Sequence, residues 1–151
     1  MKFSVPTFLT CAAFAATSWA LPQRRDCADS SKFGDLEVVP SNLAPGDSFT
    51  VHVDFTCANQ LGVYPKYTDY YFAVPVNNNG YEPPVLLYRM DYGGGTADTF
   101  TAQVPDAFQF NASYTLELQA TFPLTGTDGS TYYEVGTTYL PLNLTVPAGD
   151  Q

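Results

Sequence analysis

The sequence is poor in the residues that most often carry catalysis and metal binding. Among its 151 residues there are three cysteines and a single histidine, His52. A tetrahedral zinc site built from Cys27, Cys57 and His52 would lack a fourth ligand, and no carboxylate spacing supplies one. The chain also has no Gly-x-Ser-x-Gly segment, which argues against a hydrolase with a nucleophile elbow. We therefore expect neither a metal ion nor an organic cofactor.

Positive charge is scarce as well. Six Lys and Arg residues stand against 15 Asp and Glu, which gives a formal net charge of −9 at pH 7. The phosphates of nucleic acid and anionic membrane surfaces repel a chain of this charge. The sequence therefore predicts an acidic protein without a nucleic-acid partner.

No apolar run is long enough to span a membrane, which takes about 18 residues or more. The longest, Phe8 to Ala16, follows the positive charge of Lys2 and is typical of a signal-peptide core. Small residues at Ser18 and Ala20 predict cleavage after Ala20, so residues 1–20 would be a signal peptide. The chain ends in a short segment, 147–151, without an apolar tail, so we expect a free secreted protein with no membrane anchor.

The dibasic pair Arg24-Arg25 resembles the sites that kexin-type proteases cut in the fungal secretory pathway. Cleavage there would make residues 21–25 a short pro-segment and leave 26–151 as the mature chain. The alternative is that the two arginines lie in a flexible terminus and the mature chain begins at Leu21. Roughly 130 residues suffice for one hydrophobic core, so the sequence predicts a single domain.

Export also accounts for the cysteines. Cys11 would leave with the signal peptide, and the remaining Cys27 and Cys57 predict one disulfide in an oxidising compartment. Two Asn-x-Ser/Thr sequons, at Asn111 and Asn143, predict N-glycosylation on the protein surface.

The hydrophobic pattern after residue 26 predicts an all-β fold. In Ser48 to Thr56, four apolar side chains alternate with polar ones, as in a strand with one buried face. Asn, Gly and Pro clusters separate similar short segments. The predicted strands are 33–39, 48–56, 67–76, 85–92, 99–104, 113–122 and 131–146. About seven strands of this spacing predict an immunoglobulin-like or fibronectin-like antiparallel β-sandwich, and Tyr114 would form a tyrosine corner.

Part of the chain, from about Val38 to Thr121, resembles the N-terminal domain of secreted fungal cell-wall proteins linked to β-1,6-glucan synthesis. The resemblance rests on Pro45-Gly46 before an alternating strand and on Val104-Pro105 before Tyr114-Thr115-Leu116. It implies an Ig-like sandwich that acts in or on the cell wall. The chain departs from that family in having no tryptophan near the second strand and no Ser/Thr-rich stalk.

Tyrosine is the most distinctive candidate for binding, because its flat apolar ring with a polar hydroxyl suits wet interfaces and sugar rings. Tyr64, Tyr67 and Tyr70 are predicted to bind a ligand, since they border a loop that contains Gly and Pro. Tyr71, Tyr81, Tyr88 and Tyr92 follow nearby. The opposing interpretation is that these rings are ordinary strand residues, some of which alternation would bury.

Other candidate chemistry is weaker. His52 and Asp54 share a strand face, as a catalytic pair could, but we favour the interpretation of a solvent-facing strand histidine near a carboxylate. Asp26, Asp29 and Asp35 lie close in sequence without the spacing of an EF-hand calcium loop. We therefore expect a non-enzymatic extracellular protein that binds or organises cell-wall polysaccharide or another extracellular partner. The alternatives are a secreted effector that binds a host protein and a glycan-active hydrolase with an unrecognised carboxylate pair.

Overall fold

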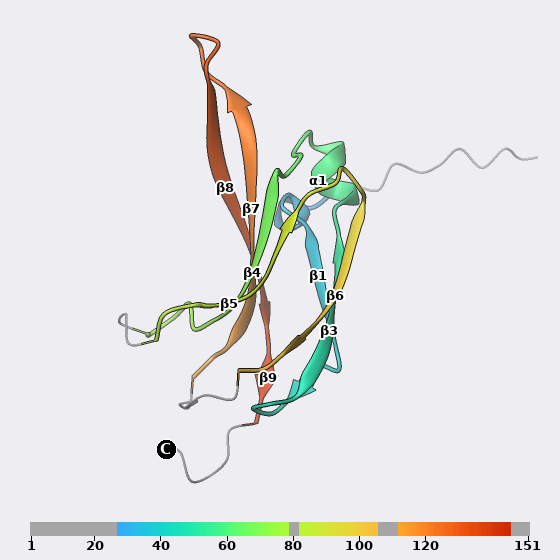
Figure 1. Cartoon of the computed structure of the whole chain (residues 1–151), viewed down its shortest axis with the longest axis vertical. Helices are drawn as coiled ribbons and strands as arrows, with labels where there is room; N and C mark the ends of the chain where they lie inside the picture. The colour runs from blue at the N-terminus through green and yellow to red at the C-terminus, as the bar shows by residue number, and fades with distance from the viewer. Residues whose placement is uncertain (1–26, 79–81, 106–111, 146–151) are drawn as a thin grey trace, which may run out of the picture.

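The computed structural model describes residues 27–78, 82–105 and 112–145. The predicted signal peptide, the pro-segment, Asp26, Tyr81 and the sequon asparagine Asn111 lie outside the described residues. In the described part, two β-sheets pack face to face (Figure 1), which confirms the prediction of an all-β sandwich.

The first sheet has three antiparallel strands in the order β1-β3-β6. They are β1 (Asp35–Val39), β3 (Ser48–Asp54) and β6 (Ala97–Gln103). The predicted alternation along β3 is confirmed, because Phe49, Val51 and Val53 are at most 3% exposed and His52 faces solvent.

The second sheet has four antiparallel strands in the order β5-β4-β7-β8. They are β4 (Tyr67–Ala73), β5 (Val85–Asp91), β7 (Thr115–Thr125) and β8 (Thr131–Pro141). A short parallel pair, β2 (Asn42–Leu43) with β9 (Asn143–Leu144), brings the strands in the described residues to nine. The prediction of about seven strands missed β2, which is too short to produce an alternating pattern, and it merged β9 with β8 into one strand, 131–146.

The described residues include two short helices: η1 (Asp29–Ser31) precedes β1, and α1 (Thr56–Gln60) lies between β3 and β4. The strand predicted to reach Thr56 ends at Asp54 instead, where the Asp54 carboxylate accepts the Thr56 amide at 2.7 Å and the chain turns into α1. Cys57 lies in this helix and forms the predicted disulfide with Cys27, across 30 positions of sequence. None of the described helices has the length and apolar character needed to cross a bilayer.

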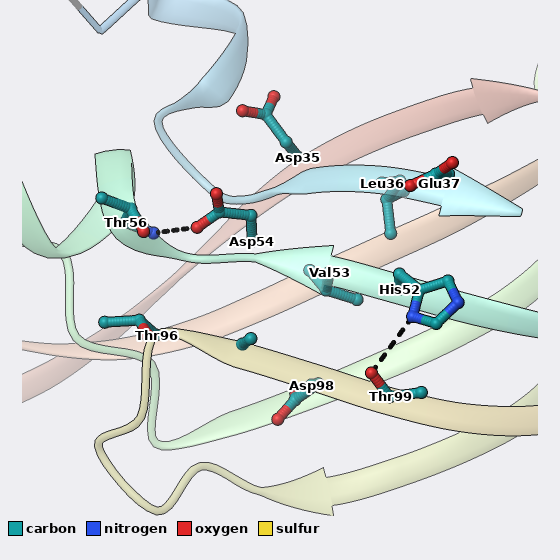
Figure 2. A pocket seen from close by; sticks show the side chains of 11 residues that line it. Asp35, Leu36, Glu37, His52, Val53, Asp54, Thr56, Thr96, Asp98 and Thr99 are labelled. Atoms are coloured by element: carbon teal, nitrogen blue, oxygen red, sulfur yellow. Dashed lines mark hydrogen bonds between the residues drawn. The ribbon is translucent and has the colours of Figure 1, made fainter. Parts of the chain in front are cut away.

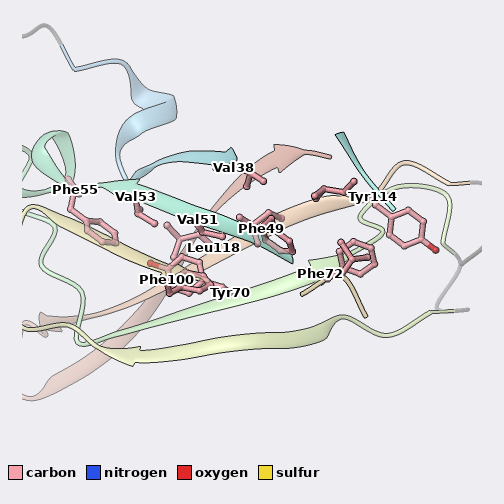
Figure 3. Close-up of a cluster of buried hydrophobic side chains, with 14 of the residues drawn as sticks. Val38, Phe49, Val51, Val53, Phe55, Tyr70, Phe72, Phe100, Tyr114 and Leu118 are labelled. Carbon is pink, nitrogen blue, oxygen red and sulfur yellow. The ribbon is translucent and has the colours of Figure 1, made fainter. Parts of the chain in front are cut away.

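Aromatic and aliphatic side chains from both sheets fill the space between them (Figure 3). Tyr70 packs against Phe100, and Phe72 stacks on Tyr114, with ring centroids 4.6 and 4.7 Å apart. The Tyr114 hydroxyl donates to Glu82 at 3.0 Å, so this buried ring ties the start of β7 to the connection between β4 and β5. Residues 106–111 of the loop before β7 lie outside the described part, so the predicted tyrosine corner stays a prediction.

Strands β7 and β8 are longer than their neighbours, and their connected ends extend past the end of the sandwich as a hairpin arm, residues 125–131 (Figure 1). Strand β4 begins at Tyr67 opposite Thr121, so beyond that point β7 pairs only with β8 in the described structure. At the tip, the Asp128 carboxylate accepts the backbone amide and the hydroxyl of Ser130, at 3.0 and 2.6 Å. These bonds lower the pKa of Asp128.

Candidate functional site

Tyr70 does not lie on the surface, which corrects its prediction as a ligand-binding residue. The ring is fully buried, and its hydroxyl donates to Asp98 at 3.0 Å. The reason is the two-residue period of a strand, which turns Thr68, Tyr70 and Phe72 of β4 to the core. Burial first, and the charge of Asp98 second, raise the pKa of the Tyr70 hydroxyl well above its usual value.

Tyr67 has the opposite orientation, because it is three residues from Tyr70 on the same strand. It lies on the outer face of the four-stranded sheet, where the register places it beside Thr121 and, one strand further, Val135. Tyr133 and Tyr139 share this face, since they are an even number of residues from Val135 on β8. We call the four side chains Tyr67, Tyr133, Val135 and Tyr139 the tyrosine face; they are 36, 51, 56 and 51% exposed.

Lys66 connects two rings of the tyrosine face. Its ammonium group lies 5.1 Å from the centre of the Tyr67 ring and 5.2 Å from that of Tyr133, and it donates to the Tyr133 hydroxyl at 3.3 Å. Because these contacts favour the charged form, they raise the pKa of Lys66. The cation therefore holds the two rings near each other and offers hydrogen-bond donors beside them.

Charged and polar side chains form the floor of this face between the rings. Arg89 of β5 makes two hydrogen bonds to Asp69 of β4, at 2.5 and 2.7 Å, and these bonds raise the pKa of Arg89. The Glu117 carboxylate accepts the Gln119 amide at 2.7 Å. Asp69 and Glu117 are only 6 and 8% exposed, so the neighbouring side chains cover both carboxylates.

Tyr133, Tyr139 and Lys66 were not among the predicted binding residues. Tyr133 and Tyr139 could have been predicted from the sequence. Leu140 and Leu142 alternate with polar residues and were expected to face inward, so the odd-numbered residues of β8 should face outward. Lys66 had no signal, since its neighbour Tyr133 lies 67 positions away. Tyr64, which was predicted, is 59% exposed in the connection between α1 and β4.

A shallow groove of about 430 Å³ lies on the first sheet (Figure 2). Four acidic residues, Asp35, Glu37, Asp54 and Asp98, line it together with His52. Nδ1 of His52 lies 3.2 Å from the Thr99 hydroxyl, while Asp54 bonds the Thr56 amide. The two members of the predicted pair thus share the groove, each with a different hydrogen-bond partner. Nothing in the geometry of these exposed groups favours catalysis over the alternative of a solvent-facing histidine.

The two sheets differ in charge. Of the Lys and Arg residues that the structure describes, Arg89 lies on β5 and Lys66 directly precedes β4, both strands of the larger sheet, and Lys32 precedes β1. The groove on the first sheet is lined by carboxylates instead. Within the described ranges, no group of three or more His, Cys, Asp or Glu side chains is arranged to hold a metal ion.

The fold and surface together define a disulfide-linked β-sandwich with an exposed tyrosine face on its larger sheet. No family model matches the chain, and the search of curated proteins finds no similar sequence.

Proposed function

We propose that this protein is a secreted, non-enzymatic, wall-associated protein that binds extracellular polysaccharide through the tyrosine face. The observation that carries the proposal is the outward display of Tyr67, Tyr133 and Tyr139 on one sheet. Isolated exposed apolar residues are common on proteins, whereas a set gathered on one face is typical of binding surfaces. Sugar rings carry apolar C–H faces and hydroxyl edges, which match the flat rings and phenolic hydroxyls of tyrosine.

The polar groups around the rings support a sugar ligand. Lys66 and the tyrosine hydroxyls supply donors, and Gln119 lies half-buried on the same face. A neutral polymer suits a chain whose formal charge is −9, because an anionic polymer would be repelled over most of the surface. The disulfide, the predicted signal peptide and the sequon at exposed Asn143 are in keeping with an extracellular setting.

The test is retention of the secreted protein on insoluble β-glucan, chitin and isolated cell walls. A variant with Tyr67, Tyr133 and Tyr139 all changed to alanine should lose retention while keeping its circular dichroism spectrum. These side chains are 36–51% exposed, so their truncation should leave the core intact.

The matched control changes Tyr64 and Tyr132 to alanine. Both rings are exposed, at 59 and 45%, and both lie off the tyrosine face, because Tyr132 is an odd number of residues from Tyr133 on β8. Retention should survive in this variant. If only the control variant lost retention, the binding site would lie in the loop before β4 instead. A wild-type protein that binds none of the polymers would refute the proposal.

A protein partner is the second candidate, because aliphatic side chains accompany the tyrosines at the same end of the sandwich. Leu61 and Val135 are 49 and 56% exposed, and a sugar surface does not need them. Failure of every polysaccharide, together with capture of a host protein that the Tyr67, Tyr133 and Tyr139 variant no longer captures, would establish this effector function instead.

A further inference from the structure

Strand β8 is an open edge of the larger sheet. It pairs with β7 over its 11 residues and has no second strand beside it in the described structure. The Leu142 amide donates to the Tyr114 carbonyl at 2.9 Å. Leu142 and Tyr114 are the next facing residues after the paired Pro141 and Thr115, so they form a hydrogen-bonded pair. Backbone groups of an antiparallel strand point alternately to one side and the other. The even-numbered residues of β8 therefore bond to β7, and the odd-numbered ones direct their amides and carbonyls to the open edge.

The side chain of Phe33 leaves this edge uncovered. A methyl group built at Gly136 would lie 2.1 Å from the Phe33 ring, and such a group projects perpendicular to the sheet. Phe33 therefore covers the inner face of β8 at Gly136 and does not block its edge. Toward Thr131, β8 belongs to the projecting hairpin arm, and a two-stranded ribbon of this kind has little stability of its own.

Of the other three edges of the two packed sheets in the described structure, β1 and β5 carry features that prevent pairing between molecules, whereas β6 has one charged residue, Asp98, and is shorter than β8, at seven residues. Strand β1 has five residues and includes Asp35 and Glu37, and β5 carries Arg89 and Asp91 beside a register irregularity at β4. Strand β8 is longer and has one charged residue, Glu134. In natural proteins, charged residues, proline or a covering segment usually protect long edge strands from pairing with other molecules. In β8 the only proline is Pro141, at the end of the strand.

We propose that two copies of this chain pair through β8, antiparallel about a two-fold axis, and join their larger sheets into one continuous sheet. A second copy fits this edge because an antiparallel edge is self-complementary: each outward amide meets an outward carbonyl of the same strand. Charge favours the same contact, since two chains of net charge −9 repel each other least where they meet along a nearly uncharged strand.

The two-fold symmetry restricts the register of the pairing. An axis at Glu134 would set two carboxylates opposite each other, which destabilises a strand pair. An axis at Val135 places Glu134 of one copy opposite Gly136 of the other, and Tyr133 opposite Thr137. The pair would then carry two tyrosine faces on one sheet, although the dimer itself does not depend on what those faces bind.

The test compares two substitutions at Thr137 by sedimentation velocity and light scattering of the secreted protein over a range of concentrations. Thr137→Pro removes an outward amide without removing a bond to β7, whereas Thr137→Ala removes the same side-chain hydroxyl and keeps the amide. Wild type and Thr137→Ala should be dimers. Thr137→Pro should dissociate roughly 10- to 100-fold more readily, because symmetry removes two hydrogen bonds from each dimer.

A second variant keeps the proposal testable if Thr137→Pro does not fold. Val135→Lys places a charge at the centre of the edge, where the same charge of the second copy would oppose it, and should give a monomer with an unchanged circular dichroism spectrum. The matched control is Val85→Lys on β5, which should remain a dimer. A wild type that is monomeric at every concentration, or a folded Thr137→Pro or Val135→Lys variant that dimerises like wild type, would overturn the proposal.

Discussion

Gly136→Ala should destabilise the protein even though glycine is usually a weak residue inside a strand. The added methyl carbon would lie 2.1 and 2.2 Å from two carbon atoms of the Phe33 ring. Carbon atoms in contact prefer separations of about 3.5–4.0 Å, so the ring must move by more than ~1 Å. That movement disturbs the stack between Phe33 and Phe122, whose centroids are 5.8 Å apart.

The expected change in the free energy of unfolding combines two destabilising contributions and one stabilising contribution. Overpacking of this kind costs about 1–3 kcal/mol, and a weakened aromatic stack costs a further ~0.5–1.5 kcal/mol. Replacing Gly136 by alanine also reduces the entropy of the unfolded chain, which returns about 0.4–1 kcal/mol. Gly136→Ala should therefore lower the free energy of unfolding by about 0.5–4 kcal/mol.

Urea unfolding, followed by circular dichroism and tyrosine fluorescence, measures this change. The double variant Phe33→Ala/Gly136→Ala removes the clash and should lose at least ~1 kcal/mol less than the two single variants combined. Gly93→Ala is the control, because nothing lies within 4 Å of the added carbon there. Additive losses in the double variant, or a Gly136→Ala protein as stable as wild type, would refute the packing of Phe33 on this glycine.

Two further predictions concern the core and the disulfide. Tyr70→Phe removes the hydrogen bond to Asp98 and should cost about 1 kcal/mol at neutral pH, measured by urea unfolding. Because the folded protein keeps the Tyr70 proton to a higher pH than the unfolded chain does, the stability that this group contributes is present below pH ~10 and is lost as pH rises further. The unfolding midpoint should thus fall more steeply above pH ~10 in wild type than in Tyr70→Phe; parallel pH curves would contradict this. Cys27→Ala/Cys57→Ala should cost about 3–4 kcal/mol, since the bridge closes a loop of 30 positions. A thermal melt of the secreted protein measures it, and an unchanged melting temperature would show that the bridge does not stabilise the fold.

Several features of the fold were predictable because they depend on residues close in sequence. The alternation of apolar and polar residues in 48–56 identified β3 and its buried face, and the same signal identified β7. The helix α1 was not predicted, since its five residues are too few to show a helical period. The pairing of Cys27 with Cys57 followed from counting, once the predicted signal peptide removed Cys11.

The candidate site was only partly predictable. Tyr67 and Tyr70 were predicted together to bind a ligand, but they lie on opposite faces of β4, so Tyr67 is exposed and Tyr70 is buried. Composition shows that tyrosines cluster along the chain, whereas the side of the sheet that each ring occupies depends on strand phase. The phase of β4 was ambiguous in sequence because Tyr, Phe and Val occur at both even and odd positions of 67–76.

The sequence by itself determined the class of fold, the disulfide and the acidic charge of the chain, because alternation, counting and composition need no knowledge of distant contacts. Only the tertiary structure decided which surface the tyrosines form. Strand order brings Tyr67 and Tyr133 to one face and inserts Lys66 between them, although 65 positions of sequence lie between the two rings. It also made β8 an edge, since the position of a strand within a sheet depends on pairing between segments far apart in sequence, which local patterns do not specify.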